Sequence, residues 1–177
     1  SNVKKIQTLE IGSALTKCND LRELFFYGKN KEISRFTELK LTDSINSLSK
    51  DMWNSSIGNK IMNLNKITIP EKHTSLGIDT FKNVKFSNIN LENITHLGEG
   101  NFYSCDDSLN LNLSDKLTTI NARAFKDTNC FTKDKPLDLK NVTKIEESAF
   151  ENSNISTLDL KLTKNIGKRA FFGSKIE

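Results

Sequence analysis

Three cysteines and two histidines are the side chains of this 177-residue sequence with the best-known metal-ligand and nucleophile chemistry. They are Cys18, Cys105, Cys130, His73 and His96. The sequence has no Cys-x-x-Cys pair and no Cys/His cluster, and its cysteine count is odd. Zinc sites and disulfide frameworks depend on such pairs. The sequence therefore predicts no metal, no cofactor and three reduced thiols.

Acid–base or nucleophilic catalysis also lacks its usual groups. Neither histidine belongs to a Ser/His/Asp or Cys/His arrangement, and no pair of carboxylates recurs at a fixed spacing. The glycine pair in Gly98-Glu-Gly100 lacks the strand–loop–helix context of a phosphate-binding loop. We therefore predict that the protein is not an enzyme and has no catalytic residue.

Composition and charge exclude two further classes of function. The net charge of +4 comes from 26 basic and 22 acidic residues, and the lysines are scattered along the whole chain. Nucleic-acid-binding proteins usually concentrate Lys and Arg on one face, so no nucleic-acid partner is expected. The sequence contains no apolar run of 18 residues, and hence no segment predicted to span a membrane.

An aromatic residue recurs along the chain at the end of a six-residue motif. The motif is an aliphatic residue, three variable residues, a small residue and an aromatic one, as in Ile120–Phe125 and Ile145–Phe150. Successive aromatic positions are 28, 21, 23, 25 and 21 residues apart, within or close to the range of about 20–29 residues in leucine-rich repeats. We expect one row of buried rings, formed by Trp53, Phe81, Phe102, Phe125, Phe150 and Phe171.

A second motif lies between the aromatic positions. It places aliphatic residues at its first, fourth and sixth positions, as in Leu64–Ile69 and Ile155–Leu160. Its end alternates apolar and polar residues, which predicts a short, half-buried strand. A coil of about 23 residues cannot bury its own apolar side, but stacked coils share a continuous core. The sequence thus predicts a solenoid whose strands form a parallel sheet.

The repeat also assigns positions to the cysteines and histidines. Cys18 and Cys105 each lie three residues after an anchor position, in a column of small residues that we expect to be buried. Cys130 lies beside an insertion and is expected to be exposed. His73 falls at an inward position filled elsewhere by aliphatic residues, and His96 falls at an outward one.

The paired motifs resemble the BspA-type leucine-rich repeat, whose unit reads approximately L-x-x-I-x-I-P-x-S-V-x-x-I-G-x-x-A-F-x-x-C. Residues 39–48 and 111–120 match this frame without gaps. The resemblance covers residues 36–176 closely and 11–26 more loosely. One departure is that proline occurs at its expected place only once, at Pro70.

The resemblance implies an α/β (β-rich) leucine-rich-repeat solenoid, a right-handed superhelix with a parallel sheet on its concave side. Residues 1–35 would form an irregular segment with a degenerate capping coil, and the repeats of residues 36–177 would continue beyond them in the parent protein. Proteins similar to this family are mostly secreted or at the cell surface and are implicated in adhesion. The predicted function is a non-catalytic protein- or glycan-binding scaffold. The alternative is a structural spacer or an intracellular protein-interaction module.

Any ligand is expected on the concave sheet face, because solenoids present their variable strand positions there. The partner would be an unidentified protein or glycan, and the sequence does not predict the oligomeric state. The face also changes from basic to acidic along the chain. The predicted ligand-binding residues are Lys40, Thr68, Asn90, Asn112, Asp138, Asp159, Lys66, Asn88, Asn110 and Thr157.

Overall fold

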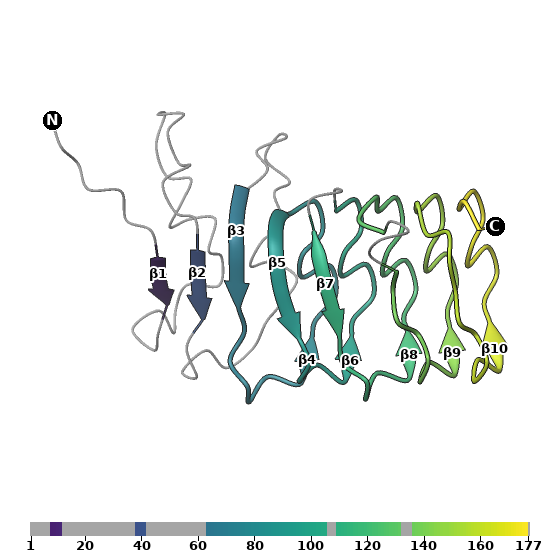
Figure 1. The fold of residues 1–177 in the computed structure, drawn as a ribbon, viewed down its shortest axis with the longest axis horizontal. Helices are drawn as coiled ribbons and strands as arrows, with labels where there is room; N and C mark the ends of the chain where they lie inside the picture. The colour runs from purple at the N-terminus through teal and green to yellow at the C-terminus, as the bar shows by residue number, and fades with distance from the viewer. Residues whose placement is uncertain (1–7, 12–37, 42–62, 106–108, 132–135, 177) are drawn as a thin grey trace, which may run out of the picture.

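The computed structural model describes residues 8–11, 38–41, 63–105, 109–131 and 136–176 (Figure 1). Within these residues the chain forms ten β-strands joined by turns and contains no helix. The five longer strands are β1 (Thr8–Ile11), β2 (Glu38–Leu41), β3 (Asn63–Thr68), β5 (Lys85–Leu91) and β7 (Asn110–Leu113). The five short ones are β4 (Ser75–Leu76), β6 (His96–Leu97), β8 (Thr119–Ile120), β9 (Lys144–Ile145) and β10 (Asn165–Ile166).

The longer strands form one parallel sheet in the order β1-β2-β3-β5-β7, so each coil adds one strand beside the last. The register aligns the aliphatic positions of the repeat: Leu39 pairs with Ile67, Ile67 with Ile89, and Ile89 with Leu111. This arrangement confirms the predicted parallel-sheet solenoid. The α part of the α/β class is not seen in the described residues, where turns take the place of helices.

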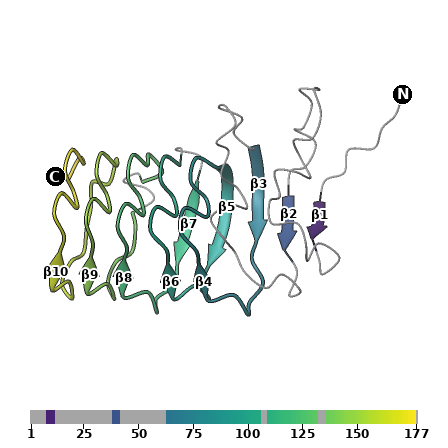
Figure 2. The ribbon, with the colours of Figure 1, turned by 180° about the vertical axis from the view of Figure 1, so that it is seen from behind.

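The short strands form a second edge of the solenoid. β4 pairs with β6, and β8, β9 and β10 pair in sequence, all in parallel. Figures 1 and 2 show them in a row along the lower edge of the molecule, with β8, β9 and β10 beyond β7 towards the C-terminus. In each pair of short strands, a buried aliphatic residue is the register partner of an identical residue in the next coil. Leu76 pairs with Leu97, and Ile120 pairs with Ile145. The coils therefore stack through two sets of parallel strands.

A row of phenylalanine rings fills the interior. The side chains of Phe81, Phe102, Phe125 and Phe150 are fully buried, and each ring stacks on the next at centroid distances of 5.7, 5.4 and 5.3 Å. Phe171 continues the row 5.3 Å from Phe150 and is half-buried. The predicted row is confirmed for these five rings, whereas Trp53 lies outside the described residues.

The turn that carries each of the five described rings has the same backbone shape. The residues two before and two after each aromatic have positive φ, between 52° and 70°. Only two of these ten residues are glycine, so the stacked coils hold the others in a conformation that L-residues seldom adopt. The first set is Asp79, Gly100, Arg123, Ser148 and Arg169, and the second is Asn83, Ser104, Asp127, Asn152 and Gly173.

Hydrogen bonds between coils explain why these turns are not helices. The backbone N–H of Phe102 donates to the carbonyl of Ala124 in the next coil, and that of Phe125 donates to Ala149, both at 2.8 Å. A helix would direct its N–H groups to carbonyls of the same segment. Here these N–H groups bond to the next coil instead. The small residue before each ring lets the neighbouring coil approach closely, and its carbonyl accepts the hydrogen bond from that coil.

The cysteine predictions are confirmed in one position and wrong in another. Cys105 and Cys130 are both buried, reduced thiols, and the Cys105 Sγ lies 3.3 Å from the carbonyl oxygen of Phe81. Cys130 was expected at the surface. It is buried because Phe131, at the start of the insertion, turns inward and packs edge-on against the phenylalanine row. Cys18 lies outside the described residues.

Both histidines lie as predicted. His73 is turned inward, with an exposed fraction of 8%, and His96 is exposed at the start of β6. The backbone N–H of His73 donates to the Pro70 carbonyl at 3.0 Å, and its buried Nε2 has no hydrogen-bond partner in the described structure. His73 thus closes a turn through its backbone, and its side chain is buried.

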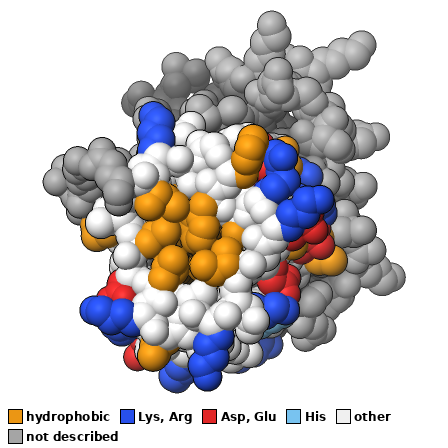
Figure 3. Space-filling view, turned by 90° about the vertical axis from the view of Figure 1, so that its right-hand side faces the viewer, with side chains coloured by type: hydrophobic (Ala, Val, Ile, Leu, Met, Phe, Trp, Pro, Cys, Tyr) orange, Lys and Arg blue, Asp and Glu red, His pale blue; other side chains and the backbone are white. Residues whose placement is uncertain are grey.

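The end of the solenoid nearest the C-terminus shows its core in cross-section. Figure 3 shows hydrophobic side chains gathered at the centre of this end, with charged side chains around them. Leu162, Ile166 and Phe172 are each more than half exposed. The apolar interior that runs through the coils therefore reaches the surface at this end.

Candidate ligand-binding face

The ten predicted ligand-binding residues all lie in the described part of the chain. Nine are exposed and Thr68 is half-buried. In β7, for example, Asn110 and Asn112 are exposed while Leu111 and Leu113 are half-buried. We call the outward-facing residues of the longer strands and of the segments 136–140 and 157–161 the sheet face. The structure places all ten residues on it, and their role in binding stays a prediction.

Strand register brings several of these residues together in rows. Lys66, Asn88 and Asn110 are direct partners across β3, β5 and β7, and Asn90 is the partner of Asn112. Neighbouring strands lie about 4.8 Å apart. Four asparagines from β5 and β7 therefore form a compact array of amide groups, in which each amide can both donate and accept hydrogen bonds.

Three residues of the predicted column have a structural role that the sequence analysis missed. In each of three coils the side-chain Oδ1 of an Asn or Asp accepts a hydrogen bond from the backbone N–H two residues later, which closes the turn at the end of the strand. The only sequence signal is an Asn or Asp at the same place in each coil. The pairs are Asn90 with Glu92 at 2.9 Å, Asp138 with Lys140 at 2.9 Å, and Asp159 with Lys161 at 3.1 Å.

The two aspartates are also paired with lysines. The Lys140 Nζ lies 2.8 Å from Asp138 Oδ2, and the Lys161 Nζ lies 3.0 Å from Asp159 Oδ2. Hydrogen bonds from the side chain and then the backbone of Lys140 lower the pKa of Asp138. The backbone and then the side chain of Lys161 do the same for the pKa of Asp159. Because each carboxylate has a cationic neighbour, the face is closer to neutral at this end than the aspartates alone imply.

The sheet face has a break beside β7. β7 pairs with β5 on one side, but on its other side no backbone hydrogen bond joins residues 109–113 to residues 136–140, all of which the structure describes. The insertion that follows Phe131 lies just before residue 137, where the next strand of the repeat is expected. We call the unpaired interval between β7 and residues 136–140 the gap; residues 157–161 likewise make no backbone hydrogen bond to residues 136–140.

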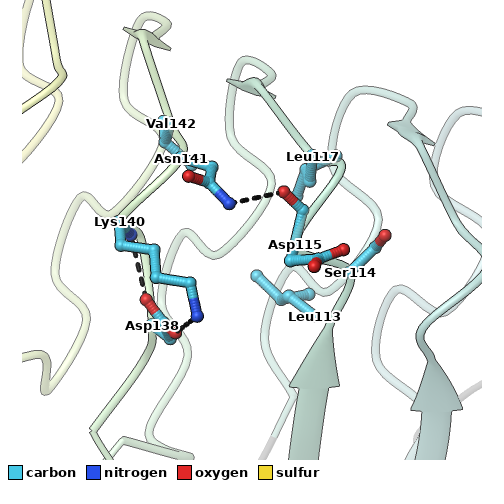
Figure 4. A pocket seen from close by; sticks show the side chains of 8 residues that line it. All are labelled: Leu113, Ser114, Asp115, Leu117, Asp138, Lys140, Asn141 and Val142. Atoms are coloured by element: carbon cyan, nitrogen blue, oxygen red, sulfur yellow. Dashed lines mark hydrogen bonds and ion pairs between the residues drawn. The ribbon is translucent and has the colours of Figure 1, made fainter.

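Two small clefts lie along this gap. One, of about 90 Å³, is lined by Leu109, Asn110, Leu111, Asn112, Cys130, Phe131, Pro136 and Leu137. The other, of about 60 Å³, is lined by Leu113, Ser114, Asp115, Leu117, Asp138, Lys140, Asn141 and Val142 (Figure 4). At the second cleft the Asn141 side chain bridges the coils, donating from Nδ2 to the Asp115 carbonyl at 2.7 Å.

A buried carboxylate on the turn side ties three coils together. Glu151 lies 2.8 Å from Arg169 Nη2 and 3.0 Å from Lys126 Nζ through the same oxygen, Oε1. Hydrogen bonds from Arg169, then Ser148, then Lys126 lower the pKa of Glu151 to about 2. Both partners of this carboxylate come from neighbouring coils, so its role is to stabilise the stack.

No group of three or more His, Cys, Asp or Glu side chains within the described ranges could hold a metal ion. No helix in those ranges has the length and apolar character needed to cross a membrane.

Coils that stack through parallel strands around one continuous core are the architecture expected of a leucine-rich-repeat solenoid. The family model described as "BspA type Leucine rich repeat region (6 copies)" matches residues 32–135 and 55–177, and the chain belongs to this family. No curated protein and no solved structure matches the chain. The family suggests a protein-interaction scaffold, and a solenoid of this kind is typically non-catalytic.

Proposed function

We propose that this protein is a non-catalytic adhesion module, secreted or held at a cell surface, that binds a protein or glycan through the sheet face. The observation that carries the proposal is the repetition of exposed polar side chains in register across neighbouring coils, as in Lys66, Asn88 and Asn110. Membership of a repeat family that is often surface-associated supports the location.

The other sides of the coil are less suited to a ligand. The aromatic rings and small residues of the turn side are buried, and its backbone groups bond from coil to coil. The sheet face instead offers polar side chains at regular spacing, which suits an extended partner. Each coil would contribute a small increment of binding, and several copies on one surface would gain affinity by avidity.

A structural spacer, or an interaction module inside the cell, is the alternative. The turn-closing bonds of Asn90, Asp138 and Asp159 favour the spacer, because they show that part of the sheet face serves the fold itself. A spacer would have no ligand on this face.

The test compares two sets of alanine substitutions on the immobilised protein. The first set, Asn110→Ala, Asn112→Ala and Thr157→Ala, removes exposed side chains of the sheet face that make no hydrogen bond in the described structure. The matched control, Glu147→Ala with Lys168→Ala, removes exposed side chains of the turn side. Binding to matrix proteins, glycans and whole cells would be measured for each.

We expect the unmodified protein and the control to bind alike and the sheet-face variant to lose most binding. Binding that survives the sheet-face changes would contradict this location of the site. If the unmodified protein binds none of these targets, the spacer alternative is favoured.

A further inference from the structure

Hollows and polar groups coincide on the sheet face at the gap beside β7. On one side of the gap Asn110 and Asn112 point outward and line the larger cleft. On the other side Asp138 and Lys140 line the smaller one. Figure 4 shows these last two side chains facing the turn that carries Asp115 across the gap.

The clefts are the right size for small polar groups. One ordered water needs about 10–15 Å³ of such space, so clefts of about 90 and 60 Å³ each have room for a small polar group. A hydroxyl or hydroxymethyl group fits there. The larger cleft also has an apolar floor that includes Leu109 and Phe131, both buried.

Most polar groups at the gap are uncharged or already paired. Asp138 is paired with Lys140, the asparagines carry no charge, and Asp115 is the one other described charged residue that lines the two clefts. A charged partner would have to compete with the existing ion pair. Amide groups, in contrast, donate and accept at once, which matches the hydroxyl groups of a sugar. The sheet face also lacks, among its described residues, the Trp, Tyr and Arg side chains that dominate tight protein interfaces.

We propose that the gap between β7 and residues 136–142 is a binding site for a neutral glycan, with Asn110 and Asn112 as its principal hydrogen-bonding side chains. The proposal rests on the proposed function and names the chemical class of its ligand. Sugar hydroxyls would bond to the two amides and to Asp138 or Lys140, while a hydroxymethyl group would enter the larger cleft.

The test is native gel electrophoresis of the whole chain in gels that contain a neutral polysaccharide: dextran, laminarin, yeast mannan or galactan. The test variant carries Asn110→Ala and Asn112→Ala, since neither side chain makes a hydrogen bond in the described structure. The matched control carries Asn93→Ala and Asn165→Ala, which are exposed asparagines that line neither cleft. Circular dichroism would verify that both variants fold.

We expect at least one polysaccharide to retard the unmodified protein and the control equally. The test variant should need about tenfold more polysaccharide for the same retardation. Raising NaCl from about 0.05 to 0.5 M should leave the retardation unchanged, because the ligand and the two principal amide groups are uncharged. Retardation by none of the four polymers, retardation that the test variant keeps, or retardation abolished by salt would each overturn the glycan site. If a protein target still binds through the sheet face, only this inference fails, and the proposed function stands.

Discussion

The rings of Phe125 and Phe150 lie 5.3 Å apart and within 10° of parallel, and the backbone N–H of Phe125 donates to the carbonyl of Ala149 at 2.8 Å. The same pair of contacts joins Phe102 to the coil of Phe125, with ring centroids 5.4 Å apart. Each of these coil interfaces therefore repeats the same ring stack and the same backbone bond at equivalent positions, among several backbone bonds between the coils. This repetition lets the solenoid grow without a separate core for every coil.

Removal of a ring from the row should be costly. Phe150→Ala leaves a cavity between Phe125 and Phe171, and we expect a loss of about 3–5 kcal/mol in the free energy of unfolding, as for other buried aromatics cut to alanine. Urea unfolding followed by circular dichroism would measure it. Phe172→Ala, at a 56% exposed ring, is the control and should cost less than about 1 kcal/mol. An equal loss of unfolding free energy in both variants would show that the stacked rings contribute no more to stability than an exposed ring does.

Glu151 should make the fold sensitive to acid. The folded-state pKa of about 2 is below the ordinary value of 4.5, so its contribution to stability is fully present above pH 4.5 and is lost as the pH falls towards 2. Glu151→Gln removes the charge that Arg169 and Lys126 contact. We expect this variant to be less stable than the unmodified protein at pH 7, with the difference shrinking between pH 4.5 and 2.

Thermal unfolding at a series of pH values would follow this difference. Glu147→Gln, which changes an exposed carboxylate of the same turn, serves as the control and should leave the unfolding temperature within about 1–2 °C at every pH. A gap between the Glu151→Gln variant and the unmodified protein that stays constant down to pH 2 would argue against the low pKa.

Asn90 and Asn112 are neighbours on the sheet face but should behave differently. Asn90 closes a turn through Glu92 N–H, so Asn90→Ala should cost a measurable amount, up to about 1 kcal/mol for this exposed bond. Asn112→Ala should lie within about 0.5 kcal/mol of the unmodified protein, because its side chain makes no hydrogen bond in the described structure. Chemical unfolding of both variants is the measurement. An equal cost at the two positions would mean that the turn bond contributes nothing to stability.

Burial, and not a disulfide bond, should protect the two described thiols from chemical modification. Cys105 and Cys130 are buried, so a thiol reagent should modify them slowly in the native protein and rapidly in denaturant. With Cys18→Ser removing the third thiol, the count in denaturant should be two. A count of zero would reveal a disulfide between them, and fast reaction in the native state would contradict the burial of Cys130.

The regular part of the repeat was predictable because its period and its residue types act together. Burial of an aromatic ring every 21 to 28 residues needs stacked coils, and the alternation in segments such as Asn110–Leu113 gives the direction of each side chain. The position of Cys105 followed from the same frame. The burial of Cys130 did not, because the path of an insertion depends on where Phe131 packs, and the repeat does not encode that.

Local sequence thus determined the solenoid, the inward and outward faces of its strands, and the absence of a recognisable catalytic motif, since each depends on spacing within one coil or between equivalent coils. Tertiary structure alone decided two other features. Glu151 meets Arg169 and Lys126 only when three coils are stacked, and the gap beside β7 depends on the path of residues 136–140, which make no backbone hydrogen bond to that strand. Both depend on distances between groups in neighbouring coils, which residue type and spacing do not specify. The closure of turns by Asn90, Asp138 and Asp159 is local, within two residues, and uses side chains that the sequence analysis assigned to a ligand.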